Sequence, residues 1–84
     1  MDKILKNPST VKSLANQIVK ACDLYLSRKI SENSLKEYLV HFARKHGDKL
    51  FNGSNLNPTV LNRIGKKRTH LVNIMLEDFQ ATLF

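Results

Sequence analysis

Residues 57–72 read NPTVLNRIGKKRTHLV, and they decide the fold because one glycine stands between two amphipathic segments. Apolar residues before the glycine recur at helical spacing: Val60, Leu61 and Ile64. In an unbroken helix, an advance of about 100° per residue would align Arg68 with Ile64 on the apolar side. A glycine costs about 1 kcal/mol inside a helix and almost nothing at a turn. The sequence therefore predicts a short helix from Pro58, a turn near Gly65, and a final helix.

The final helix carries an apolar stripe of its own. That stripe consists of Leu71, Val72, Met75 and Phe79, with further apolar surface at Leu76, Leu83 and Phe84. The last three aromatic and aliphatic residues, Phe79, Leu83 and Phe84, either close the core or mediate a homodimer.

Two longer helices are predicted before this stretch. The first covers residues 9–28, after cap candidates beside Pro8, with a stripe of Val11, Leu14, Ala15, Ile18, Val19, Cys22, Tyr25 and Leu26. The second has the stripe Leu35, Tyr38, Leu39, Phe42, Ala43 and His46. Ser34 with Glu37 has the spacing of a capping box, and Ser31 is the rival cap. Gly47 is expected to end this helix in a left-handed conformation. The short loop between the two helices implies antiparallel packing.

The region between the second helix and Pro58 is less regular. Asn52-Gly53 could close a tight hairpin, but its flanks are too short to predict strands. Asn57-Pro58 repeats the cap-plus-proline pattern of Asn7-Pro8. The predicted fold class is therefore all-α: an antiparallel helical hairpin plus a short helix and a C-terminal helix.

Length and composition narrow the function classes. A chain of 84 residues holds one core, so a single domain over residues 1–84 is expected. The single cysteine, Cys22, cannot close an intrachain disulfide, and three histidines with one cysteine have no zinc-finger spacing. No apolar run is long enough for a signal-peptide core or a membrane span. We expect a cytoplasmic protein with no cofactor, no metal and no membrane partner.

The positive charge is concentrated in one part of the chain. Fourteen lysines and arginines face seven acidic residues, which leaves a net charge of +7. Residues 49–76 contain five cations and no acidic residue. Four of these cations fall within six residues: Arg63, Lys66, Lys67 and Arg68. Such a cluster is typical of a binding surface for a polyanion, and equally of a solvated basic face.

The position of the cluster favours an anionic ligand. If the final helix begins at Gly65, three cations occupy its first turn, where the helix dipole disfavours positive charge by about 0.3–1 kcal/mol each. The same turn offers free backbone N–H groups beside the ammonium groups of Lys66 and Lys67, which together suit a phosphate or a carboxylate. Arg68 lies on the apolar stripe, so we expect it to pair with Asp48, Glu37 or a carbonyl at a helix C-terminus.

A DNA-reading helix-turn-helix is an alternative arrangement for this segment. With Gly65 as the turn glycine, four residues stand where the motif needs apolar side chains: Val60, Ile64, Leu71 and Ile74. Leu61 stands where a small residue is usual and Lys66 where an apolar one is usual, so both argue against it. Base-contact candidates are Lys67, Arg68, His70 and Asn73, of which Arg68 and Asn73 have bidentate chemistry.

Catalysis is not expected. His41 and His46 are five residues apart and face different sides of a helix, so they form no metal clamp. Glu77 and Asp78 are adjacent and cannot flank a scissile bond. No catalytic residue is assigned.

Arg63 to Arg68, followed by Leu71-Val72, resembles a family of short, basic, uncharacterised helical proteins from Firmicutes and their mobile elements. The resemblance covers most of the chain and depends mainly on Gly-Lys-Lys-Arg at residues 65–68. It implies a bacterial or phage cytosolic origin and transfers no catalytic residue.

Two function classes follow from the sequence. In the first, the chain binds nucleic acid, with Arg63, Lys66 and Lys67 on phosphates, Arg68 orienting the turn, and His70 and Asn73 nearby. In the second, it is a protein-interaction module, an adaptor or inhibitor that binds an acidic protein partner. Charge alone does not separate the two classes.

Overall fold

The computed structural model describes residues 4, 7–53 and 55–83, and for residues 78–83 it describes the backbone alone. The elements in chain order are α1 (Val11–Leu26), α2 (Glu32–Lys45), α3 (Gly47–Leu50), β1 (Phe51–Asn52), β2 (Asn55–Leu56) and α4 (Pro58–Leu83). The all-α prediction is confirmed, with a two-stranded hairpin of minimal length added to it.

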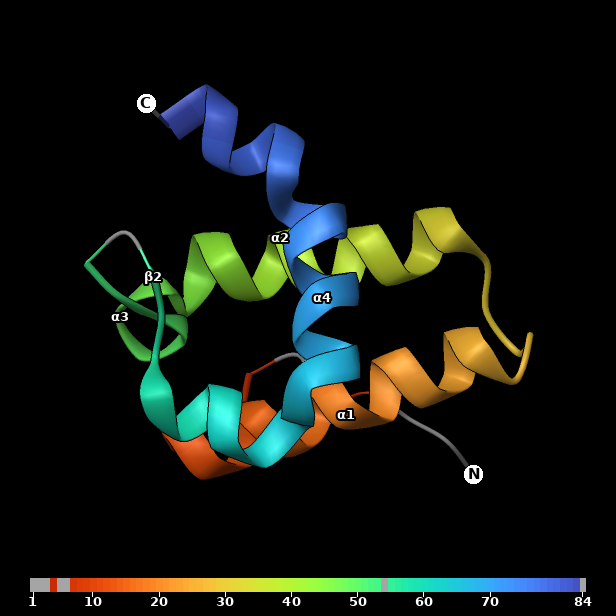
Figure 1. Ribbon diagram of the computed structural model, residues 1–84, viewed down its shortest axis with the longest axis horizontal. Helices are drawn as coiled ribbons and strands as arrows, with labels where there is room; N and C mark the ends of the chain where they lie inside the picture. The colour runs from red at the N-terminus through yellow and green to blue at the C-terminus, as the bar shows by residue number, and fades with distance from the viewer. Residues whose placement is uncertain (1–3, 5–6, 54, 84) are drawn as a thin grey trace.

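Helices α1 and α2 run side by side in opposite directions, and α4 crosses and packs against both (Figure 1). Their apolar stripes meet in one core, whose largest fully buried members include Leu14, Ile18, Leu35, Leu39, Phe42, Ile64 and Leu76. Each such side chain contributes roughly 1.5–3 kcal/mol by leaving water. The side chains of Phe79 and Leu83, and all of Phe84, lie outside the described residues, so a homodimer through them stays a prediction.

Serine and threonine side chains set the starts of α1 and α2. The Oγ1 of Thr10 accepts a hydrogen bond of 3.0 Å from the backbone N–H of Ser13. The Oγ of Ser31 accepts one of 3.1 Å from the N–H of Ser34. Such caps satisfy N–H groups that have no partner inside the helix. Ser31 is therefore the cap of α2, and the prediction that preferred Ser34 was wrong by one turn.

Helix α1 is shorter than the predicted 9–28 and ends through a left-handed residue that is not glycine. Arg28 has φ +63°, its N–H donates to the carbonyl of Tyr25 at 3.0 Å, and the N–H of Lys29 donates to Leu24 at 2.8 Å. These two hydrogen bonds define a Schellman motif, which satisfies carbonyls at the end of the helix. They also turn the chain toward Ser31, so that α2 can run back along α1.

Gly47 does not end α2 in the left-handed conformation that was predicted. His46 is the last cap residue of α2, with φ −130°, and Gly47 opens α3 instead. The N–H groups of Lys49 and Leu50 both donate to the carbonyl of His46, at 3.0 and 2.9 Å. Leu50 is fully buried, and its packing holds the short helix in place.

The hairpin forms around Gly53, as the Asn52-Gly53 dipeptide allowed. Phe51 pairs with Leu56 and Asn52 with Asn55 in an antiparallel register, and Gly53 has φ +69°. Strands were not predicted here because four residues carry too little periodicity to indicate them. The buried side chain of Leu56 supplies the tertiary contact that anchors this segment.

Asn57 connects the hairpin to α4 and caps it. Its Oδ1 accepts a hydrogen bond of 2.9 Å from the N–H of Thr59, and its Nδ2 donates to the carbonyl of Lys49 at 3.2 Å. Pro58 is the first residue of α4, where its missing N–H costs little. The predicted Asn57-Pro58 helix start is confirmed.

Gly65 divides α4 into a first part (58–64) and a second part (66–83). Its backbone has φ 81° and ψ 169°, a region that residues with a Cβ rarely adopt. The ribbon changes direction sharply at this point (Figure 1). The predicted break is confirmed, and it directs the stripe of Val72, Met75 and Leu76 onto the core formed by α1 and α2.

The substitution Gly65→Ala tests this break, because a broken helix and a continuous helix predict opposite changes in the free energy of unfolding. A Cβ at this position would meet no heavy atom within 4 Å, so the cost is backbone strain alone. We expect the free energy of unfolding in urea to fall by roughly 1–3 kcal/mol. A continuous helix would instead gain about 1 kcal/mol from the same change. Asn62→Ala, at an exposed helical position of the first part, is the control and should leave stability unchanged or slightly raised.

Candidate nucleic-acid interface

The second part of α4 begins directly after Gly65, so its first turn is made of Lys66, Lys67 and Arg68. The hydroxyl of Thr69 donates a hydrogen bond of 2.7 Å to the carbonyl of Gly65, which fixes the start of this turn. The first N–H groups of a helix have no partner within it, and they carry the positive end of the helix dipole. The positive side chains of Lys66 and Lys67 therefore lie at the positive end of the helix dipole.

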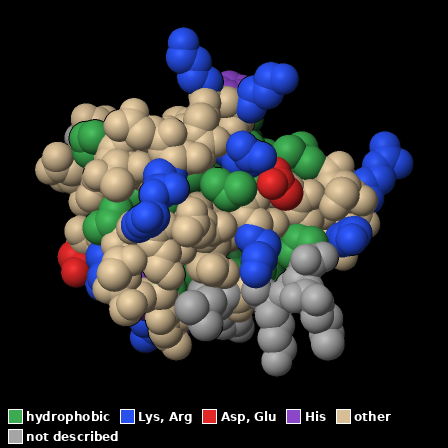
Figure 2. All heavy atoms as spheres, turned by 90° about the horizontal axis from the view of Figure 1, so that it is seen from below, with side chains coloured by type: hydrophobic (Ala, Val, Ile, Leu, Met, Phe, Trp, Pro, Cys, Tyr) green, Lys and Arg blue, Asp and Glu red, His purple; other side chains and the backbone are tan. Residues whose placement is uncertain are grey.

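Arg63, Lys66 and Lys67, which we call the basic turn, are exposed to solvent. None of them forms an ion pair with a carboxylate among the described side chains, which exclude those of Asp2 and Asp78. The face formed by α1 and the first part of α4 shows more Lys and Arg than acidic side chains (Figure 2). The basic turn thus keeps its positive charge available to an anion.

Arg68 is engaged differently from its neighbours. Its Nε and Nη2 donate to Oδ1 of Asp23 at 3.0 and 2.8 Å, and Nη2 also donates to Oδ2 at 3.1 Å. Its Nη1 donates to the carbonyl of Ile64 at 3.3 Å. A carbonyl at a helix C-terminus was a predicted partner, whereas the predicted carboxylates Asp48 and Glu37 were wrong. Asp23 takes their place because α4 packs on α1.

His70 and Asn73 lie on the exposed side of the second part of α4. A spacing of four and seven residues from Lys66 places them on the same helix face as that lysine. Thr69 is half-buried on the edge of this face. The structure therefore groups Lys66, His70 and Asn73 together, with Lys67 beside them and Arg63 before the break.

The segment departs from a helix-turn-helix. Val60 and Ile64 are buried as that motif requires, but Ile74 is 51% exposed. In addition, the interruption is the single residue Gly65, after which the helix resumes at once. In a helix-turn-helix, the residue at the position of Ile74 packs against the preceding helix. Because Ile74 is exposed here, the second part of α4 does not pack as a recognition helix does.

Cys22 is buried, as its place on the α1 stripe predicted. Burial raises the pKa of its thiol from 9.0 to about 11; nearby Arg68 lowers the pKa and Asp23 raises it, both by less. The thiol is therefore neutral at physiological pH and has no nucleophilic character.

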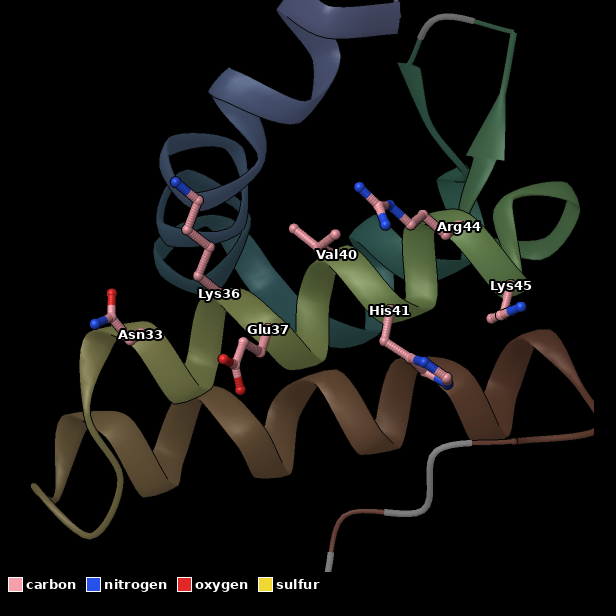
Figure 3. Close-up of a pocket in the computed structure, with 7 residues that line it drawn as sticks. All are labelled: Asn33, Lys36, Glu37, Val40, His41, Arg44 and Lys45. Atoms are coloured by element: carbon pink, nitrogen blue, oxygen red, sulfur yellow. The ribbon is translucent and has the colours of Figure 1, made fainter.

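The outer face of α2 forms a shallow hollow of about 500 Å³. Lys36, Val40 and Arg44 point to the side where the later part of α4 lies, Glu37, His41 and Lys45 point to the other side, and Asn33 lies at the start of the helix (Figure 3). All seven residues come from one helix, so no second element among the described residues supplies an opposite wall. Ligand sites usually enclose most of their ligand, and we regard this surface as a solvated helix face.

A second hollow, of about 660 Å³, lies where the hairpin meets α4. Its polar residues are Asn52, Asn55, Thr69 and Asn73. Its apolar residues are Leu56, Pro58 and Leu61. Of these seven residues, only Asn73 was predicted from the sequence as a binding residue. The frequent asparagines of residues 52–62 were a visible signal for a polar surface here.

The part of the chain that the structure describes has neither a metal-binding cluster nor a membrane-spanning helix. No group of three His, Cys, Asp or Glu side chains there is placed to hold a metal ion. No helix in this part of the chain has the length and apolar character needed to span a bilayer.

These features define a small helical protein with an exposed basic turn. Residues 5–77 match the CLB_0814 family, described as a conserved hypothetical protein, and the chain belongs to this family. No curated protein and no solved structure matches the chain.

The Arg68–Asp23 pair is tested by a double-mutant cycle of Arg68→Met and Asp23→Asn. Because these side chains are 35% and 50% exposed, we expect a coupling of about 0.5–1 kcal/mol in the free energy of unfolding. Salt at about 1 M should reduce the coupling. Strictly additive single mutations would show that the pair does not position the second part of α4.

The burial of Cys22 predicts a pH dependence of stability. Its folded pKa of about 11 lies above the ordinary value of 9.0, so the unfolded state loses the thiol proton first as pH rises. The contribution of this group to the free energy of unfolding should be constant below about pH 9 and should fall between pH 9 and about pH 11, by up to about 1.4 kcal/mol per pH unit. Cys22→Ala should show a shallower fall over the same range. Parallel curves for the two proteins would contradict the burial of the thiol.

Proposed function

We propose that this protein binds nucleic acid without catalysing a reaction, and that Arg63, Lys66 and Lys67 contact phosphates. The observation that carries the proposal is the exposure of the basic turn, which has no ion pair with a described carboxylate. Phosphate contacts of this kind give affinity and orientation but carry no sequence information directly.

The energetics of the turn support an anionic ligand. Lysines in the first turn of a helix are each disfavoured by about 0.3–1 kcal/mol at low ionic strength, whereas Asp or Glu would be favoured. A bound phosphate reverses this penalty, because the N–H groups and the ammonium groups of Lys66 and Lys67 then face negative charge. Folding alone gives no reason for lysine at both positions.

The other members of the cluster have separate roles in the proposal. Arg68 is held by Asp23 and the carbonyl of Ile64, so it positions the turn while its neighbours contact the ligand. His70 and Asn73 share the exposed face with Lys66 and would approach the bases. Of the two, Asn73 has the amide chemistry that matches an adenine edge.

The proposal extends to the setting of the protein. Polyanion binding by the basic turn fits a cytoplasmic protein of bacterial or phage origin, which the resemblance of residues 63–68 implies. It includes no cofactor, no membrane partner and no catalytic group.

One observation favours a second function, binding to an acidic protein partner. Ile74 is 51% exposed and lies seven residues after Lys67, on the same side of the second part of α4. An apolar side chain beside cations is a suitable anchor for an acidic protein surface. Stoichiometric binding to one acidic protein, unchanged by competitor DNA, would favour this function over the first.

The salt dependence of binding tests the first function. We expect fluorescence anisotropy with labelled duplex DNA, single-stranded DNA and RNA to show affinity that falls with salt. If three phosphates are neutralised, log K against log salt should have a slope near −2.7 for duplex DNA and near −2.1 for single strands. The double variant Lys66→Glu, Lys67→Glu should weaken binding and flatten the slope.

The matched control is Lys12→Glu, Lys45→Glu, which makes the same change of net charge at exposed positions on α1 and α2. It should retain most of the affinity of the parent. A folded Lys66→Glu, Lys67→Glu variant that binds as well as the parent would overturn the assignment of the site.

A further inference from the structure

The hollow between the hairpin and α4 exists because Gly65 turns the helix. In a straight helix, Pro58 and Asn73 would lie about 22 Å apart along the axis, at 1.5 Å per residue. In the structure both line the same hollow, together with Asn52 and Asn55 from the hairpin. The two parts of α4 and the hairpin therefore form three walls of one concave surface.

The polar side chains of this hollow are uncharged and can form hydrogen bonds with a ligand. The side-chain amides of Asn52, Asn55 and Asn73 have no hydrogen-bond partner among the described residues and are exposed to solvent. The hydroxyl of Thr69 donates to Gly65 and keeps its oxygen free to accept. An amide presents a donor and an acceptor side by side, so these residues suit a ligand edge with both.

Apolar residues complete the hollow. Leu56 is buried, Leu61 is half-buried, and Pro58 is exposed at the rim. None of the described residues that line the surface is charged, although Lys66 stands one turn before Thr69 on the same helix. A flat, uncharged ring with donors and acceptors on its edge fits this lining, and an anionic group attached to that ring would reach the basic turn.

We propose that this hollow receives an unpaired nucleobase, so that the ligand of the basic turn is single-stranded nucleic acid. The inference rests on the proposed function and specifies its ligand. A base stacked in a duplex offers only its edge in a groove, whereas an unpaired base can place its face on Leu61 and Pro58 and its edge toward the amides. Adenine presents an amino donor beside a ring acceptor and therefore complements the amide of Asn73.

The test compares three labelled ligands of equal length: a single strand of adenylates, the same strand with abasic sites in place of its bases, and an adenine–thymine duplex. We expect the adenylate strand to bind about five- to a hundredfold more tightly than the abasic strand, the range of one good bidentate contact to a base. It should also bind more tightly than the duplex. Equal binding of adenylate and abasic strands, or tighter binding of the duplex, would overturn the inference.

Asn73→Leu assigns the effect to the hollow, and Asn16→Leu, an exposed asparagine on α1, is its matched control. The first variant should reduce the preference for adenylate over the abasic strand to nearly one while it keeps the affinity for the abasic strand. The control should keep the preference. Retention of the preference by Asn73→Leu would assign the base to another surface.

Nuclear magnetic resonance of the unaltered protein tests base binding in the hollow without a variant. Adenosine monophosphate should shift the side-chain amide resonances of Asn52, Asn55 and Asn73 and leave that of Asn16 in place. Shifts absent from all three would overturn the inference. Salt-dependent binding of the abasic strand requires the basic turn but not the hollow, so it tests the proposed function separately from the base-binding inference. If the abasic strand shows no such binding, the proposed function itself is contradicted.

Discussion

Gly65 holds a backbone conformation, φ 81° and ψ 169°, that a residue with a Cβ adopts only under strain, and the course of the second part of α4 follows from it. Because the helix turns there, Val72 and Leu76 are buried against α1 and α2. The same turn creates a second helix N-terminus in the middle of α4. It faces solvent and begins with Lys66 and Lys67.

The three consecutive cations after this glycine divide into two kinds. Arg68 has its charge satisfied inside the molecule by Asp23 and by the carbonyl of Ile64. Lys66 and Lys67 carry a compact charge on a flexible stem and remain in solvent. Arginine is suited to the first role because its planar group donates several hydrogen bonds at once. The charge of Arg68 is thus used within the molecule, whereas those of Lys66 and Lys67 face solvent.

Most local features of this chain were predictable from its sequence, although the cap of α2 and the conformation of Gly47 were not, and specific long-range contacts were not predictable. The break at Gly65, the cap at Asn57 and the buried Cys22 follow from residues within one or two turns. Asp23 lies 45 residues from Arg68, so no spacing rule could have selected it over Glu37. Similarly, the strands depend on the burial of Leu56, and the hollow needs three separate segments to meet.

The backbone conformation of the α1–α2 connection limits which residues can occupy position 28. Arg28 occupies a left-handed position that glycine adopts without strain, and two backbone hydrogen bonds next to it hold the turn regardless of the side chain. Members of the family are consequently expected to exchange arginine for glycine or asparagine here without altering the path of the loop. A β-branched residue at this point would instead mark a relative whose first two helices are joined in a different way.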